Sequence, residues 1–106
     1  MTKNSKTLNF IGLCRKAGKI TFGTTMVEDS IKSHKTKLVI MAADSSEKSK
    51  KNMNLICDNY NIPFYEYSTI EDISKYIGER NKSVIGITDI NFAKELIKRL
   101  EEGGED

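Results

Sequence analysis

The run Leu38-Val39-Ile40-Met41-Ala42-Ala43 constrains the fold most, because six consecutive apolar residues need cover on both sides. A strand with one face in water alternates apolar and polar residues, whereas a strand buried on both faces is continuously apolar. Leu38–Ala43 is therefore predicted to be a central strand between two layers. Three further runs rich in branched and aromatic residues are also predicted to be strands: Ile20–Phe22, Ile62–Tyr67 and Val84–Thr88.

Helix-start signals lie between these runs. Ser68 with Glu71, and Thr25 with Glu28, form capping boxes, and the second would open a helix over residues 26–33. The other predicted helix signals are a first helix from about Ser5 to Lys16, caps at Asp44 and Asp89, and terminating glycines at Gly78 and Gly103-Gly104. Strands that alternate with helices predict a small α/β domain with helices on both faces of its sheet.

The basic residues are concentrated in the first half of the chain. Residues 1–51 carry eleven Lys and Arg against four Asp and Glu, whereas residues 52–106 carry six against eleven. This asymmetry suggests one basic surface that faces a polyanion. A mixed-charge surface without a partner explains the composition equally well.

Chain length and cysteine content favour one domain in the cytoplasm. The 106 residues suffice for one hydrophobic core, so residues 1–106 are expected to form a single domain. No apolar stretch approaches the roughly 18 residues of a membrane helix, and residues 1–10 lack a signal-peptide core. Cys14 and Cys57 are too few to staple a secreted mini-domain and are expected to be reduced core thiols.

The sequence contains no convincing motif for catalysis or metal binding. His34 lies alone in a polar loop, and the two cysteines have no paired ligand nearby. Residues 12–19 fail as a phosphate loop, because five residues separate Gly12 from Gly18 where the motif has four. We therefore predict a protein that is not an enzyme and needs no cofactor.

The best candidate for a binding site is basic. Arg15, Lys16 and Lys19 precede Gly23-Thr24-Thr25, where a helix is predicted to begin. A helix N-terminus carries unpaired N–H groups and a partial positive charge, so it can hold a phosphate that a glycine allows to approach closely. Equally consistent is that Gly23 only makes the turn and Thr25 only caps the helix.

Several short motifs follow one another along almost the whole chain, from about Leu8 to Leu100. They are Gly12-Leu13-Cys14-Arg15-Lys16-Ala17-Gly18-Lys19, Phe22-Gly23, Lys37-Leu38-Val39-Ile40, Ala42-Ala43-Asp44, Cys57-Asp58-Asn59-Tyr60-Asn61-Ile62-Pro63, Val84-Ile85-Gly86-Ile87-Thr88-Asp89 and Phe92-Ala93. This ordered set resembles the "L seven Ae" family of ribosomal proteins, and within it a short bacterial branch.

The resemblance implies a three-layer α/β/α sandwich with a central mixed sheet of about four strands. It also implies binding to RNA at a kink-turn, where a duplex bends sharply beside tandem sheared G·A pairs. The helix after Gly23 would enter at the bend. The loop from Gly78 to Lys82 would make a second contact, and in relatives this loop covers a flipped-out nucleotide with apolar side chains. Residues 79–82 are polar in this chain.

The chain departs from the family pattern where bases are read. Strong kink-turn binders carry Gly-x-Asn-Glu-x-x-Lys on this helix, and here Thr25, Met26 and Asp29 occupy the Asn, Glu and Lys positions. Met26 cannot accept a guanine N–H as a carboxylate does, and Asp29 would repel phosphate. The positioning part of the site is thus kept better than the base-reading part.

We therefore predict a monomeric cytoplasmic protein that holds a bent structured RNA, with ribosome association implied by the family. The predicted RNA-binding residues are Arg15, Lys16, Lys19, Gly23, Thr24, Thr25, Met26, Asp29, Lys32, Glu79, Arg80 and Asn81, with Lys35 and Lys37 extending the footprint. The alternative is a protein-interaction module on the same fold, with weak or no RNA binding, whose acidic second half forms the contact surface.

Overall fold

The computed structural model describes residues 5–103, which form nine regular elements joined by short connections. In chain order they are α1 (Lys6–Lys16), β1 (Ile20–Phe22), α2 (Thr24–Lys32), β2 (Leu38–Met41), α3 (Glu47–Asn59), β3 (Phe64–Glu66), α4 (Ile70–Tyr76), β4 (Val84–Ile87) and α5 (Ile90–Glu101). Within these residues, no helix is both long enough and apolar enough to cross a membrane.

The four strands form one mixed sheet in the order β1-β4-β2-β3. β4 pairs antiparallel with both β1 and β2, whereas β2 and β3 run parallel. In the centre of the sheet Ile40 lies opposite Ile85, and both side chains are fully buried. All four predicted strands are present, although each of the three predicted runs after β1 is longer than the strand that it contains.

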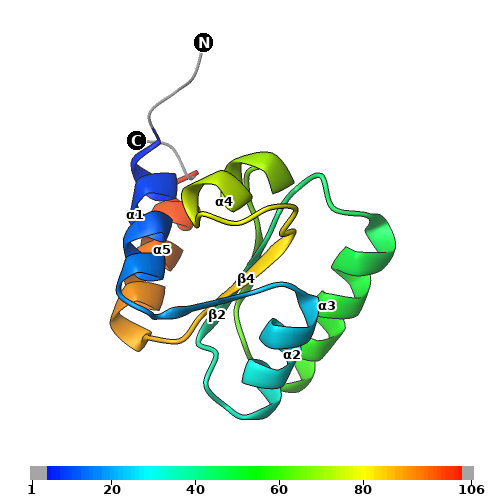
Figure 1. The fold of residues 1–106 in the computed structure, drawn as a ribbon. Coiled ribbons are helices and arrows are strands. Elements are labelled where there is room, and N and C mark those ends of the chain that lie inside the picture. The colour runs from blue at the N-terminus through cyan, green and yellow to red at the C-terminus, as the bar shows by residue number, and fades with distance from the viewer. Residues whose placement is uncertain (1–4, 104–106) are drawn as a thin grey trace.

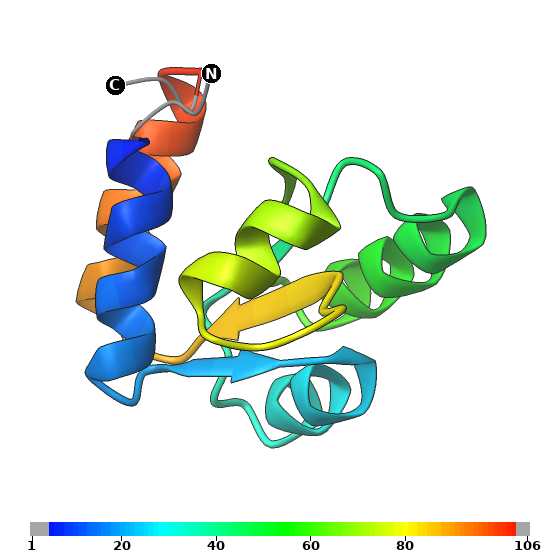
Figure 2. The ribbon, with the colours of Figure 1, turned by 45° about the horizontal axis from the view of Figure 1, so that its top comes forward.

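The alternation of side chains along β2 divides the core into two parts. Leu38, Ile40 and Ala42 pack with residues of α1, α4 and α5, whereas Val39 and Met41 pack with residues of α2 and α3. Figures 1 and 2 show the resulting layers, with α1, α4 and α5 on one side of the sheet and α2 and α3 on the other. The predicted three-layer α/β/α sandwich is confirmed, and the apolar run is indeed covered on both faces.

Several of the predicted helix ends are confirmed. Ser5 caps α1, and the Asp89 carboxylate caps α5 by accepting the N–H groups of Asn91 and Phe92. Gly78 and Gly103 follow the ends of α4 and α5 with φ values of 72° and 95°, a conformation that favours glycine. Gly104 lies outside the described residues.

Both predicted capping boxes are wrong. α4 is capped by Thr69, whose hydroxyl accepts the N–H of Asp72, while Ser68 has a φ of 63° and lies before the cap. Asp44 does not cap the helix that follows it, where Ser46 does so, but accepts the N–H of Ile70 at the start of α4. The bond between Asp44 and Ile70 joins segments 26 residues apart, so no local pattern reveals it.

The start of α2 also differs from the prediction. The helix begins at Thr24, with Gly23 in the N-cap position, rather than at residue 26 with a Thr25 cap. Thr25 therefore lies inside the first turn, where its hydroxyl is on an exposed part of the surface. This shift leaves the helix end without the side-chain oxygen that the capping box would have supplied.

Cys14 and Cys57 are buried, reduced thiols, as the sequence predicted. Burial, with a smaller effect from Asp89, raises the pKa of Cys14 from 9.0 to about 11. Burial, with a smaller effect from Asp58, raises the pKa of Cys57 to about 12. Both thiols are thus held in the neutral form and are poor nucleophiles at neutral pH.

The raised thiol pKa values predict that the protein loses stability at alkaline pH. Above about pH 9 the unfolded chain releases these two protons while the folded chain keeps them, so the free energy of unfolding falls as the pH rises. Urea unfolding at pH 8 and pH 10 measures this effect. Relative to a Cys14→Ala/Cys57→Ala variant, the wild type should lose more stability between the two pH values. An equal loss in both proteins would contradict the assignment.

Candidate nucleic-acid interface

The centre of the candidate site is Gly23, at the junction between β1 and α2. Its φ of 86° and ψ of 150° fall in a region that is essentially restricted to glycine. Its N–H donates to the Val84 carbonyl of β4 (3.0 Å), and its carbonyl accepts the N–H of Val27 (3.0 Å). The turn is therefore fixed by the sheet on one side and by the helix on the other.

The N-terminus of α2 is open. Within the described residues no side chain caps it, and the first intrahelical bond begins at Val27. The N–H groups of Thr24, Thr25 and Met26 thus remain outside the hydrogen-bond ladder of the helix. The first turn is also uncharged, so no carboxylate there neutralises the positive end of the helix dipole. This arrangement suits a phosphate.

The side chains around this opening are exposed. Thr24 and Thr25 are exposed, and Met26 shows 48% of its surface to solvent. Asp29 is exposed one turn further along, on the same helical face as Thr25. The structure therefore brings together four predicted site residues, three of which are those that depart from the family pattern.

The second part of the site is the α4–β4 loop, residues 77–83. Ser74, which is only 4% exposed, accepts the N–H of Lys82 (2.7 Å) through its hydroxyl and donates to the Lys82 carbonyl (3.2 Å). The Lys82 side chain passes close to Gly23, since a Cβ added there would lie 4.0 Å from Lys82 Cδ. The ammonium group of Lys82 lies 5.8 Å from the centre of the Phe22 ring.

Lys82 belongs to the predicted contact loop but is not among the predicted RNA-binding residues. The loop was predicted as a contact, but only Glu79, Arg80 and Asn81 were singled out. In the structure Arg80 and Asn81 are exposed in the loop, and Lys82 is the residue beside the helix opening. Its position depends on the pairing of β1 with β4, which no local pattern in the sequence reveals.

Arg15, at the end of α1, reaches the same loop. Its Nε donates to the Ile77 carbonyl (3.1 Å), and its Nη2 forms an ion pair with Glu79 Oε2 (3.0 Å). The guanidinium carbon lies 4.8 Å from the centre of the Phe22 ring. Neighbouring Lys16 is exposed and lines a groove of about 520 Å³ between α1 and α4.

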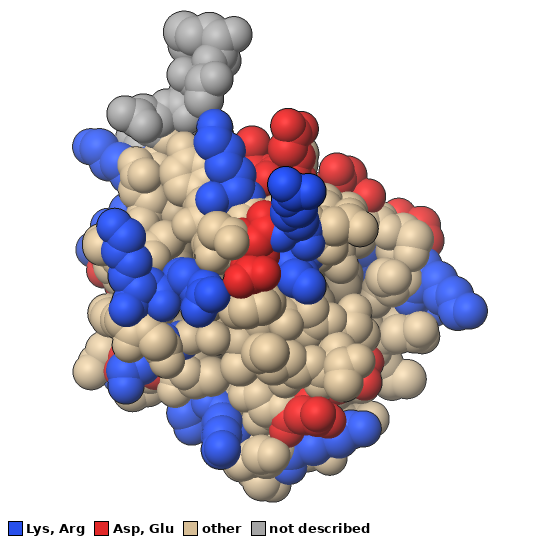
Figure 3. All heavy atoms as spheres, in the orientation of Figure 1, with Lys and Arg blue, Asp and Glu red and all other residues tan. Residues whose placement is uncertain are grey.

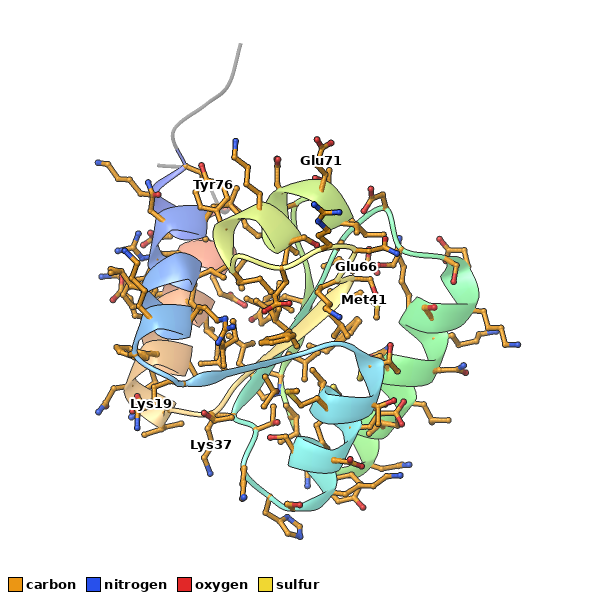
Figure 4. All side chains as sticks on the ribbon, in the orientation of Figure 1. Lys19, Lys37, Met41, Glu66, Glu71 and Tyr76 are labelled. Atoms are coloured by element: carbon orange, nitrogen blue, oxygen red, sulfur yellow. The ribbon has the colours of Figure 1, made fainter. Side chains whose placement is uncertain are left out.

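The remaining predicted lysines lie elsewhere. Lys19 and Lys37 are at the end of the sheet away from α4, as Figure 4 shows, and their backbones bond to Thr88 and Ile87 at the end of β4. Lys19 lies four positions before Gly23 along an extended segment, a distance of about 13 Å. Lys32 ends α2, about 12 Å along the axis from its first residue. Lys19, Lys32 and Lys37 are thus not part of the opening.

Charged side chains are distributed unevenly on the face of the molecule that carries α1 and β1. Figure 3 shows Lys and Arg atoms along the side formed by α1, and a largely uncharged centre over β1.

Among residues 5–103 no group of three or more His, Cys, Asp or Glu could hold a metal ion. His34 is exposed in a loop, with its ring centre 5.8 Å from that of Tyr60.

Comparison with known proteins identifies the family. Residues 5–97 match the model of the "Ribosomal protein L7Ae/L30e/S12e/Gadd45 family". The chain belongs to this family. The predicted resemblance is confirmed, and the matched residues include the whole of α2 and the α4–β4 loop.

Two curated bacterial proteins are similar in sequence. One, named RNA-binding protein YlxQ, from Enterococcus faecium, is 38% identical over 98 residues, which cover 92% of this chain and 93% of the relative. Another protein of that name, from Bacillus subtilis (strain 168), is 29% identical over 91 residues, covering 86% of this chain and 91% of the relative. These relatives confirm the predicted match to a short bacterial branch.

Two solved structures have the same fold. A protein of unknown function from Bacillus halodurans superposes with a TM-score of 0.89 at 26% identity, over 92% of this chain and 99% of the other. The 15.5kD RNA binding protein of Giardia lamblia superposes with a TM-score of 0.74 at 18% identity, over 90% and 84% of the two chains. The second likeness concerns the fold alone.

Proposed function

We propose that this chain binds a structured RNA at a sharp bend of the kink-turn type. We name the contact surface the α2 site, defined as Gly23, Thr24, Thr25, Met26 and Lys82. The observation that carries the proposal is the open N-terminus of α2 with a positioned cation beside it. The names of the curated relatives support RNA as the anion, since both are called RNA-binding proteins.

The binding mode follows from the chemistry of the α2 site. The three open N–H groups and the Lys82 ammonium recognise phosphate, which fixes position but carries no sequence information. The exposed Met26 offers an apolar contact to a base or sugar, and Asp29 opposes a nearby phosphate. Binding should therefore depend on the shape of the RNA backbone more than on its bases.

In this proposal residues 1–106 act as a single RNA-binding domain. It stabilises one bent conformation of the RNA without catalysing a reaction and without a cofactor. Family membership supports a ribosomal or ribosome-associated RNA as the partner and the cytoplasm as the place of action. All residues of the α2 site come from one chain, so a monomer suffices.

The test is a pair of binding titrations at one fixed salt concentration. One RNA contains a kink-turn, and the other is a straight duplex of the same length and base composition. The proposal expects at least about tenfold tighter binding to the bent RNA, a difference of about 1.4 kcal/mol. Equal affinities would contradict shape recognition. Failure to bind either RNA would favour the protein-interaction alternative.

Lys82→Ala should weaken the salt dependence of RNA binding. Each phosphate that a cation neutralises contributes about 0.7–0.9 to the slope of log K against log salt. Removing Lys82 should therefore make the slope less steep by about that amount. Lys48→Ala, on the exposed surface of α3, is the matched control and should leave the slope unchanged. Identical slopes in the wild type and both variants would place the phosphates elsewhere.

A further inference from the structure

The guanidinium of Arg15 is engaged on two of its nitrogens and on its face. Nε donates to Ile77, Nη2 pairs with Glu79, and the guanidinium carbon lies over the Phe22 ring. These partners come from two separate parts of the chain: β1 and the α4–β4 loop. These contacts use two of the five guanidinium N–H groups and hold the group in a fixed orientation.

We infer that Arg15 is a positioning residue for RNA binding and not a phosphate ligand. It joins the end of α1 to the start of the α4–β4 loop, and thereby keeps Lys82 beside the open N-terminus of α2. The inference rests on the proposed function, which supplies the role of Lys82. It replaces the direct phosphate contact that the sequence predicts for Arg15.

The contacts of the loop support this role. Arg15 holds its first part at Ile77 and Glu79, and Ser74 holds its last part at Lys82. Arg80 and Asn81, between the two attachments, are exposed. Phe22 connects the attachments across the sheet edge, since its ring lies near both Arg15 and Lys82. Releasing Arg15 should therefore loosen the part of the loop that precedes Lys82.

The pairing also has an electrostatic consequence. The Glu79 carboxylate lies in the loop that is proposed to approach RNA, where an unpaired negative charge would repel phosphate. Its bond to Arg15 neutralises that charge. The side chains of Arg15 and Glu79 are 40% and 27% exposed, and pairs this exposed contribute little to global stability. Variants at either position should therefore fold.

Arg15→Lys separates positioning from phosphate binding. Lysine keeps the charge but cannot reproduce the planar contacts to Ile77, Glu79 and Phe22 together. If Arg15 positions the loop, Arg15→Lys should bind the kink-turn RNA about threefold to tenfold more weakly, the effect of one lost hydrogen bond. Wild-type affinity in Arg15→Lys would overturn the inference.

Glu79→Gln gives a second, opposite expectation. If Glu79 competed with RNA for Arg15, removing its charge would tighten binding. If the pair positions the loop, Glu79→Gln should weaken binding, and adding Arg15→Ala should cause a smaller further loss than Arg15→Ala causes alone, since the two side chains share one contact while Arg15 also contacts Ile77 and Phe22. Within the Glu79→Gln background, Arg15→Ala should leave the salt slope unchanged. A slope less steep by about 0.7–0.9 would show a phosphate contact and overturn the inference.

Arg99 provides a matched control on α5. Its Nε pairs with Glu95 (2.8 Å), and its guanidinium carbon lies 5.0 Å from the centre of the Phe10 ring, so it makes the same kinds of contact. Arg99→Lys should leave RNA affinity unchanged. An equal loss in Arg15→Lys and Arg99→Lys would reflect general loosening of the protein and would overturn a specific role for Arg15.

Amide hydrogen exchange on the free protein tests the positioning without RNA. The N–H groups of Glu79 and Lys82 both bond to Ser74, at 2.8 and 2.7 Å, and report on the loop. In Arg15→Lys they should exchange about fivefold faster or more, while the buried Ile40 amide keeps its rate. Unchanged exchange at Glu79 and Lys82 would overturn the inference. Because this measurement needs no ligand, it stands apart from a failure of the chain to bind RNA.

Discussion

Gly23→Val is expected to weaken RNA binding by about 10- to 150-fold, the effect of losing one hydrogen bond to a charged group. A branched side chain at this position would stand at the opening of α2, where the proposed phosphate approaches the N–H groups of Thr24, Thr25 and Met26. It would also lie against the Lys82 side chain, 4.0 Å from Cδ. Both effects act directly on the α2 site.

The same substitution should lower the free energy of unfolding by about 1–3 kcal/mol, because valine cannot adopt the φ of 86° without strain. Gly18→Val is the matched control. Gly18 also has a positive φ, of 72°, and open space around its Cβ position, but lies at the other end of β1. It should lose stability and keep RNA affinity. A Gly23→Val protein that is destabilised yet binds RNA fully would mean that Gly23 only makes the turn.

The triple change Thr25→Asn/Met26→Glu/Asp29→Lys should tighten binding to a kink-turn RNA by about tenfold or more. In the pattern Gly-x-Asn-Glu-x-x-Lys these side chains meet guanine edges and the backbone, and one good base contact is worth about 1–3 kcal/mol in duplex DNA. All three positions are exposed on α2. Since Thr25 does not cap the helix, replacing it removes no capping bond.

The gain should be confined to the bent RNA. On a straight duplex only the added positive charge acts, so the improvement should be small and should vanish at high salt. Asp58→Lys, on the exposed surface of α3, adds charge away from the α2 site and serves as the control. Equal gains on bent and straight RNA would mean that charge alone is responsible. No gain on either would place the RNA surface away from α2.

The layers of the fold were predictable because they depend on local patterns. The continuous apolar run of β2 required two covering layers, and the alternation of strands with helices required an α/β sandwich. Of the caps that the sequence predicts, only Asp89 caps its helix, and the start of α1 near Ser5 also agrees with the prediction. At α4 two adjacent residues could cap, and contacts from the distant Asp44 accompany the choice of Thr69.

Only part of the α2 site was predictable, because local patterns in the sequence reveal some of its residues and not others. Gly23 stands out in the sequence because it precedes a predicted helix and follows basic residues. In the structure it forms the turn before the open N-terminus of α2. Lys82 and the pairing of Arg15 with Glu79 join segments about 60 residues apart, so no local spacing reveals them. Lys19 and Lys32 are near Gly23 in sequence but are carried away from it by β1 and α2.

The most direct test of the α2 site is a titration of the ¹⁵N-labelled protein with kink-turn RNA, followed by the shifts of its backbone amide signals. The largest changes are expected at residues 23–26 and 79–82, because these carry the open N–H groups and the loop that holds Lys82. Signals from α5, on the opposite face of the sheet from α2, and from β3, at the sheet edge away from β1, should stay in place. Changes concentrated on α3 and β3, or around Lys35 and Lys37, with residues 23–26 unmoved, would contradict the account.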